Sequence, residues 1–169
     1  MAHSFTAWSI DRTIPSVLDV GHRLLEEMLS KIQAENWSSR DLFGLRLALE
    51  EAVVNAIKHG NCLDSAKSVH VECHSTAEKI WIRVSDQGRG FNPEAVPDCT
   101  DPDRIDVPNG RGIMLMRNYM SRVEYSERGN VVTMEKLRDQ QAPVNTKLFQ
   151  CCSPSSHTTL ARATVAGVC

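Results

Sequence analysis

Four short segments with strand-like patterns constrain the fold of this chain more than any other feature. Apolar and polar residues alternate over residues 69–73 and again over residues 80–84, with a polar stretch between them. Two further short apolar segments, 123–125 and 131–134, flank the turn-forming residues 127–130. Period-two alternation is typical of half-buried strands, and short polar connections join neighbouring antiparallel strands. The sequence therefore predicts two β-hairpins in a largely antiparallel sheet.

Helical spacing of apolar residues predicts the elements that cover this sheet. Residues 17–32 repeat apolar positions every three to four residues, and residues 112–120 do so over a shorter length. A short mixed segment, residues 5–10, is interpreted as an edge strand. With a long helix over 41–59, these elements predict an α/β (α+β) two-layer sandwich, in which a mostly antiparallel mixed sheet carries its helices on one face.

The predicted long helix has start and stop signals and two distinct faces. Ser38, with Asp41 three residues later, is similar to a capping box in which Asp replaces Glu, and Gly60 is a natural C-terminal stop. One stripe suits a hydrophobic core and comprises Leu42, Leu45, Leu49, Ala52 and Ala56. A second stripe is small at its start and polar afterwards and comprises Gly44, Ala48, Glu51, Asn55 and either Lys58 or His59. It indicates either a solvated face or a surface beside which something other than a side chain is bound.

Length and charge limit the classes of function. A chain of 169 residues is the size of one domain, and its formal net charge of -2 provides no electrostatic surface for nucleic acid or an anionic membrane. No stretch reaches the roughly 20 apolar residues that span a bilayer. The six cysteines form no Cys-x-x-Cys pair, so we expect free thiols in a cytoplasmic protein. The polar composition of the C-terminal residues predicts a domain over 1–138 and a mobile tail over 139–169.

Two glycine-containing segments stand where a ligand-binding backbone is useful. Asp86-Gln-Gly88-Arg-Gly90 places a carboxylate at the end of a predicted strand, and its glycines permit positive φ and close approach to a ligand. Gly110-Arg111-Gly112 precedes the short helix, where free N–H groups and the helix dipole favour a phosphate. A plain Gly-rich turn is the alternative for either segment alone. The stretch 88–110 is too long for an ordinary connection, which predicts a lid.

The common nucleotide-binding motifs are missing from the sequence. It contains no Gly-Lys-Ser/Thr of a P-loop, and neither the His-Arg-Asp nor the Asp-Phe-Gly element of eukaryotic-type protein kinases. Gly88 and Gly90 lack the third glycine of a dinucleotide fingerprint and follow an acidic strand end. These nucleotide-binding folds are therefore excluded.

The order of the pieces resembles the GHKL ATPase superfamily of gyrase, heat-shock chaperone and histidine kinase. The N box, G1 box and G2 box of that superfamily are matched by Glu51–Asn61, Asp86–Phe91 and Gly110–Ile113. Within it, Leu49-Glu-Glu-Ala-Val-Val-Asn-Ala-Ile-Lys-His-Gly60 and Gly110-Arg-Gly-Ile-Met-Leu-Met116 are similar to the anti-sigma-factor serine/threonine kinases of the RsbW and SpoIIAB type. The resemblance spans residues 5–137 and implies a Bergerat-type ATP-binding fold.

The resemblance implies ATP and magnesium as cofactors and assigns roles to single residues. Asn55 corresponds to the family's magnesium ligand, Glu51 to its general base and Asp86 to the acceptor of the adenine amino group. Thr133 matches a Thr near the pocket floor of related ATPases, and a plain strand residue is an equal interpretation. The other implied ATP-binding positions belong to the two glycine boxes and are Gly88, Gly90, Phe91, Gly110, Gly112 and Ile113.

Positive charge for the phosphates has several candidate sources. Lys58, His59 and Arg111 are candidates, because phosphoryl transfer depends on positioning and charge neutralisation. Alternatively, Lys58 and His59 compensate the helix dipole and Arg111 faces solvent. Related sporulation kinases carry an Arg just before the G2 glycines, where this chain has Val107-Pro-Asn109. Arg104 and Arg111 are therefore the candidate substitutes.

By the same resemblance, the chain is expected to be a protein serine/threonine kinase that acts as an anti-sigma factor. Its substrate would be an antagonist with a STAS fold, its second partner a sigma factor, and its assembly a homodimer. One alternative is a nucleotide-dependent partner-switching module without phosphotransfer. Another is the catalytic domain of a histidine kinase, which is less expected because no dimerisation helix with a phosphoacceptor His precedes the N box in this sequence.

Overall fold

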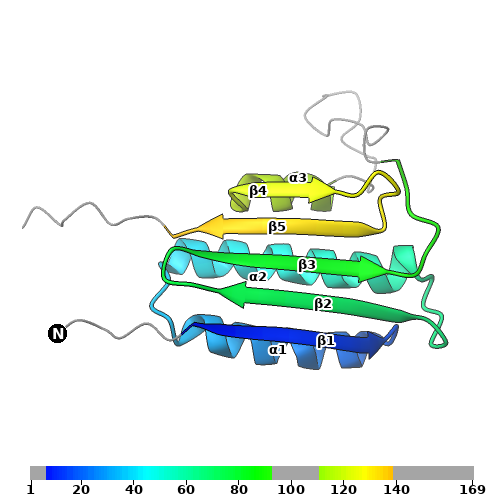
Figure 1. Cartoon of the computed structure of the whole chain (residues 1–169), viewed down its shortest axis with the longest axis horizontal. Coiled ribbons are helices and arrows are strands. Elements are labelled where there is room, and N and C mark those ends of the chain that lie inside the picture. Colours follow the sequence, from blue (N-terminus) through cyan, green and yellow to red (C-terminus); the bar gives the residue numbers. More distant parts are fainter. Residues whose placement is uncertain (1–6, 93–110, 139–169) are drawn as a thin grey trace, which may run out of the picture. The chain divides into compact units, whose positions relative to one another are not determined.

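Five strands form one antiparallel sheet in a computed structural model that describes residues 7–92 and 111–138. The strands are β1 (Trp8–Pro15), β2 (Ser68–Ser75), β3 (Lys79–Asp86), β4 (Arg122–Tyr125) and β5 (Val131–Leu137), and their order in the sheet is β1-β2-β3-β5-β4 (Figure 1). Both predicted hairpins, β2–β3 and β4–β5, are confirmed. The expectation of a mostly antiparallel sheet is confirmed, and each of the neighbouring strand pairs in the described residues is antiparallel, so the mixed part of that expectation has no parallel pair among them.

Helices cover one face of this sheet, which confirms the two-layer prediction (Figure 1). They are α1 (Leu18–Gln33), α2 (Ser39–Asn55) and α3 (Arg111–Tyr119), and α2 continues into a π-helical turn, η1 (Ala56–Gly60). None of the helices in the described part of the chain is long and apolar enough to cross a membrane.

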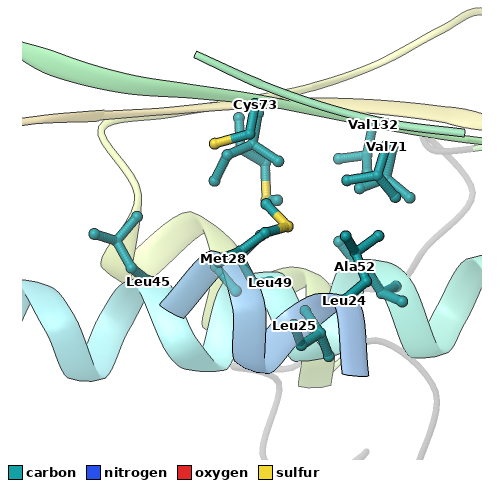
Figure 2. Packing of buried hydrophobic residues seen from close by; sticks show 14 of the residues in the cluster. Leu24, Leu25, Met28, Leu45, Leu49, Ala52, Val71, Cys73 and Val132 are labelled. Carbon is teal, nitrogen blue, oxygen red and sulfur yellow. The ribbon is translucent and has the colours of Figure 1, made fainter. Parts of the chain in front are cut away.

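The hydrophobic core fills the space between the helices and the sheet. Figure 2 shows side chains of α1 and α2, such as Met28 and Leu49, directed toward Val71, Cys73 and Val132 of the sheet. Strand β2 illustrates why, because its alternate residues from Val69 to Ser75 are buried and the residues between them are not. The predicted core stripe of the long helix is confirmed, since Leu45, Leu49, Ala52 and Ala56 are buried and Leu42 packs against them.

The N-terminus of α2 is fixed by the predicted capping box. The Ser38 hydroxyl accepts a hydrogen bond from the backbone N–H of Asp41 at 3.1 Å and donates one to Asp41 Oδ2 at 2.8 Å. The buried carboxylate of Asp41 also pairs with Lys136 Nζ of β5 at 2.8 Å. Burial acts to raise the pKa of Asp41, but the hydrogen bonds and charge of Lys136 and the Ser38 hydroxyl outweigh it and hold the pKa below its usual range. The cap therefore also ties the helix layer to the sheet.

Four predictions of element bounds were wrong or fall wholly or mostly outside the described residues. The first strand was expected over 5–10, but it runs over Trp8–Pro15, because Ile10 and Ile14 both face the core and pairing with β2 continues to Pro15. The long helix was expected to remain α-helical to His59, but its last turn is a π-helix. Most of the predicted lid (residues 93–110 of 88–110) and the predicted tail (139–169) lie outside the described residues.

Candidate functional site

Glu51 and Asn55 of α2 form a directly bonded pair one helical turn apart. Asn55 Nδ2 donates a hydrogen bond to Glu51 Oε1 at 2.8 Å, and both side chains are half-buried. The bond uses an N–H donor of the Asn55 amide. The oxygen of the same amide, Oδ1, is the type of ligand that Mg²⁺ accepts. The same bond fixes the orientation of the Glu51 carboxylate, which is an acceptor-only group when ionised.

Helix α3 begins directly against this pair. A Cβ atom at Gly112 would lie 1.6 Å from Glu51 Oε1 and 2.1 Å from its Cδ, so only glycine permits the approach. The predicted N box and G2 box are therefore neighbours in space, although residues 62–109 separate them in the sequence. The N-terminal turn of α3, whose first N–H groups have no partners within the helix itself, lies beside the Glu51 carboxylate.

The small residues at the start of the second stripe have a different explanation from the one expected. A Cβ atom at Gly44 would lie 2.8 Å from Tyr119 Cβ and 2.9 Å from Tyr119 Cδ1, so the side chain of Tyr119 fills the space beside Gly44. Ala48 is buried in the core. The expectation that something other than a side chain fills this part of the stripe was wrong, because α3 packs there. Glu51 and Asn55, further along the stripe, remain part of the candidate site.

Asp86 ends β3, as predicted, and its carboxylate is closely surrounded by backbone. Asp86 Oδ1 accepts a hydrogen bond from the Gly88 N–H at 2.7 Å. A Cβ atom at Gly60 would lie between 2.3 and 2.6 Å from the three carboxylate atoms. Burial raises the pKa of Asp86, although the Gly88 N–H and the charges of Arg128 and Lys67 oppose the rise. The carboxylate is thus a half-buried acceptor at the end of η1.

The loop after Asp86 is held by the turn between β4 and β5. Gly90 uses the positive φ that a glycine permits, 76°, and a Cβ atom there would lie 1.8 Å from the carbonyl oxygen of Arg128. The Arg128 guanidinium donates to the Gly88 carbonyl at 3.2 Å. A Cβ atom at Gly88 would lie 2.0 Å from the Gly60 carbonyl oxygen. In this structure both glycines of the G1 box therefore permit close approach of protein backbone.

Thr133 lies away from the other predicted site residues. It pairs with Arg83 on β3, whereas Asp86 shares its side of the sheet with the buried residues Ile82 and Val84. Because neighbouring residues of a strand point to opposite faces, Thr133 is on the face away from the helices. Its assignment to the ATP site is not supported, and the plain strand interpretation holds.

Sequence reasoning missed Asn130, which contacts Asp86 directly. Its side-chain Nδ2 donates to the Asp86 carbonyl at 3.0 Å, and its own carbonyl accepts from the Asp86 N–H at 2.9 Å. Asn130 directly follows Gly129, whose φ is 75°. The Gly-Asn pair was recognised as a turn, but a turn signal does not say which distant strand end the turn will meet.

Sequence reasoning also missed Tyr125 of β4, whose ionisation is influenced by the charge of Glu51. Burial and the negative charge of Glu51 raise the pKa of Tyr125, and the charge of Arg117 opposes the rise. The ring of Tyr125 meets that of Phe91 edge to face, with centroids 5.2 Å apart. Phe91 of the G1 box is thus packed on β4, with 40% of its surface exposed.

The structure describes only some of the residues predicted to contact the phosphates. Lys58 and His59 are exposed side chains of η1, in the last turn of the helix, where they also suit the helix dipole. Ile113 of α3 is half-buried and packs against the core. Gly110 and Arg104 lie outside the described residues, and Arg111 is described only as the backbone start of α3.

Comparisons with known proteins agree with this arrangement. The model of the histidine kinase-like ATPase domain matches residues 19–136. The serine/threonine-protein kinase BtrW of Bordetella bronchiseptica is 26% identical over 96 residues, which are 56% of this chain and 68% of that protein. The serine-protein kinase RsbW of Listeria innocua is 26% identical over 141 residues, 79% of this chain and 88% of its own. The anti-sigma F factor of Clostridium perfringens is 33% identical over 103 residues, 57% of this chain and 72% of its own.

A solved structure shows the same fold. The crystal structure of the RsbU and RsbW domains of a Mycobacterium tuberculosis protein superposes with a TM-score of 0.53 and 15% sequence identity. The superposition covers 78% of this chain and 32% of the other, so this chain spans about a third of that larger protein. At this identity the likeness concerns the fold alone.

Proposed function

Because this chain belongs to the histidine kinase-like ATPase family, and within it to the anti-sigma-factor serine/threonine kinases, we propose that it phosphorylates a partner protein with MgATP and thereby controls a sigma factor. The observation that carries this proposal is the Glu51–Asn55 pair. The two side chains are joined by a 2.8 Å hydrogen bond and lie directly beside Gly112 at the start of α3. A carboxylate and a carboxamide fixed beside a helix N-terminus supply a base, a metal ligand and a phosphate-binding backbone in one place.

The residues present fit a magnesium ion bound together with ATP. Mg²⁺ usually takes one or two protein oxygens and completes its shell with phosphate oxygens and water, and Asn55 Oδ1 is such an oxygen. When bound there with ATP, the ion would supply positive charge to the phosphates. Asn55 is positioned for this ligand role by its own hydrogen bond to Glu51.

Glu51 is proposed as the base of the transfer. Its carboxylate accepts the proton of a Ser or Thr hydroxyl on the partner, the hydroxyl oxygen forms a bond to the terminal phosphorus, and the bond from phosphorus to the ADP oxygen breaks. The bond from Asn55 Nδ2 holds one carboxylate oxygen in place during this step. Glu50 is exposed on another face of α2 and is not part of the proposed machinery.

Asp86 is proposed to bind the adenine ring. An ionised carboxylate accepts a hydrogen bond from the adenine amino group and repels the carbonyl oxygen that guanine carries at the same position. Support comes from the half-buried position of Asp86 and from the absence of a side chain at Gly60 directly in front of it. Lys58, His59, Arg104 and Arg111 remain the candidates for contacts with the phosphates.

We further propose the partners that the relatives' names indicate. One relative is named an anti-sigma factor and two are named serine or serine/threonine kinases, which supports a sigma factor as one partner and a hydroxyl-bearing antagonist as the other. An antagonist of the STAS fold and a homodimeric, cytoplasmic kinase are the specific forms of this proposal.

Transfer of labelled phosphate tests the proposal. The protein is incubated with labelled ATP, magnesium and a STAS-fold antagonist, as wild type and as the variants Glu51→Gln and Glu50→Gln. Glu51→Gln keeps an acceptor for Asn55 but removes the base, so we expect ATP binding without transfer, whereas Glu50→Gln transfers normally. Transfer that persists in Glu51→Gln refutes the base. ATP binding without any transfer by the wild type would instead establish a partner-switching module, and an acid-labile phosphoryl group on the protein itself would indicate a histidine kinase.

A further inference from the structure

Asn61, directly after η1, is a completely buried polar side chain that the proposed mechanism does not use. Its Nδ2 donates hydrogen bonds to Ser16 Oγ at 2.6 Å and to the Ser68 carbonyl at 2.8 Å. Its Oδ1 accepts a hydrogen bond from the backbone N–H of Gln87 at 2.9 Å. Both donors of the amide and its acceptor are therefore engaged, each with a different segment of the chain.

The bond to Gln87 lies next to the proposed adenine site. Gln87 follows Asp86, and Gly60, whose Cα faces the Asp86 carboxylate, precedes Asn61. The end of η1 and the end of β3 thus meet along two consecutive residues, Gly60 against Asp86 and Asn61 against Gln87. A second hydrogen bond, from the Ser68 N–H at the start of β2 to Gln87 Oε1 at 2.8 Å, also holds Gln87 at this meeting point of η1 and β3.

The backbone after Asn61 is strained, which indicates that its position is imposed by these contacts. Cys62 and Leu63 are consecutive non-glycine residues with positive φ, 57° and 59°. Such residues persist where surrounding structure over-determines them. Here the fixing contacts are the Asn61 side chain and the bond from the Leu63 N–H to the Ile57 carbonyl at 2.9 Å.

We infer that Asn61 is a positioning residue that holds Asp86 in place through Gln87, and thereby sets the preference of the site for adenine over guanine. This inference rests on the proposed role of Asp86. A carboxylate discriminates between the two bases only while it is held at the edge that differs between them, where it accepts from the adenine amino group and repels the guanine oxygen. Loss of the Asn61 acceptor removes the partner of the partly buried Gln87 N–H and frees the Asp86–Gly88 segment to shift.

Calorimetric titration with MgATP and MgGTP tests the inference on the full chain. We compare the wild type, Asn61→Ala, the matched variant Ser16→Ala and Asp86→Asn. Ser16→Ala removes one partner of the same buried amide but leaves its bond to Gln87 intact. We expect Asn61→Ala to bind ATP about tenfold more weakly with little change for GTP, because the loss of one hydrogen bond typically costs about the equivalent of a tenfold change. Ser16→Ala is expected to melt at a lower temperature but to keep the wild-type ATP/GTP ratio.

The outcomes distinguish a failure of the role inferred for Asn61 from a failure of the adenine site proposed at Asp86. If Asn61→Ala lowers the melting temperature but keeps the ATP/GTP ratio, Asn61 is merely structural and the inference is overturned. If the wild type binds neither nucleotide, or if Asp86→Asn keeps the ATP preference, the adenine site itself is refuted and the inference with it. Should Asn61→Ala fail to fold, amide hydrogen exchange of the wild type decides: the Gln87 N–H is expected to be protected, and exchange at the rate of an open loop overturns the inference.

Discussion

Replacement of Gly60 by alanine is a sharp test of how Asp86 is held. The new Cβ atom would lie 2.3 Å from Asp86 Cγ and 2.5 and 2.6 Å from its two oxygens. Ordinary contacts of this kind need about 3.5 Å, so the Asp86 side chain must retreat by roughly 1 Å. The retreat disrupts the 2.7 Å hydrogen bond that Asp86 Oδ1 accepts from the Gly88 N–H.

The expected effects on stability and on ATP binding differ in size. Gly60 does not occupy the left-handed region, since the described glycines with positive φ are Gly90 and Gly129, so alanine suits its backbone and favours the helix by up to about 1 kcal/mol. A lost hydrogen bond to a charged group costs about 1.5–3 kcal/mol, which the gain in helix propensity partly offsets. Binding of adenine gains nothing from the helix, so ATP affinity falls by roughly 10- to 100-fold.

Calorimetry with MgATP and urea unfolding measure the two effects separately. The matched control is Gly21→Ala in α1, where the new Cβ atom meets only the side-chain methyls Ile57 Cδ1 at 2.7 Å and Val53 Cγ1 at 3.2 Å. Gly21→Ala is expected to bind ATP like the wild type. If Gly60→Ala also binds ATP with wild-type affinity, the close contact does not position Asp86 and the reasoning is refuted.

Three other predictions concern pH, an ion pair and a strand residue. Burial raises the pKa of Asp86 above its ordinary 3.8, so ATP affinity is expected to fall as the pH drops through that raised pKa and the carboxylate is protonated. A decline of the same size in Asp86→Asn, which has no carboxylate at this position, would contradict this. Lys136→Met leaves the Asp41 carboxylate buried without the lysine 2.8 Å away and should lower the free energy of unfolding in urea by about 3 kcal/mol, whereas an unchanged midpoint would show that the pair is not stabilising. Thr133→Val should leave ATP affinity unchanged, because Thr133 is on the outer face of the sheet, and a loss of binding would return Thr133 to the site.

Local patterns in the sequence were sufficient for most elements of the fold. The alternation over 69–73 and 80–84 predicted β2, β3 and the strand end that carries Asp86, because side-chain period is a property of neighbouring residues. The capping residues before α2 were predicted for the same reason. Such signals depend on chemistry within a few residues.

The misplaced site residues depended on contacts between distant segments. Thr133 was assigned without knowledge of the register that pairs it with Arg83, and register decides which face of a sheet a residue takes. The space beside Gly44 was assigned without knowledge that Tyr119 of α3 fills it. Spacing along the helix did not distinguish Lys58 from His59, because residues three and four positions after Asn55 both lie on its side of an α-helix. The structure has a π-helical turn there, which such spacing did not predict.

The strand order has a consequence for how the protein folds. Strands β2 and β3 join across a short turn, as do β4 and β5, but β3 must also pair with β5, so that Ser85 meets Val131. Loop-closure entropy makes such a distant pairing slow compared with the two local hairpins. Asp86 and Asn130 are in contact at the end of the β3–β5 pair, so they come together only when these two strands pair. A nucleotide that binds there acts on the last contact to form, and we expect it to slow unfolding more than it speeds folding.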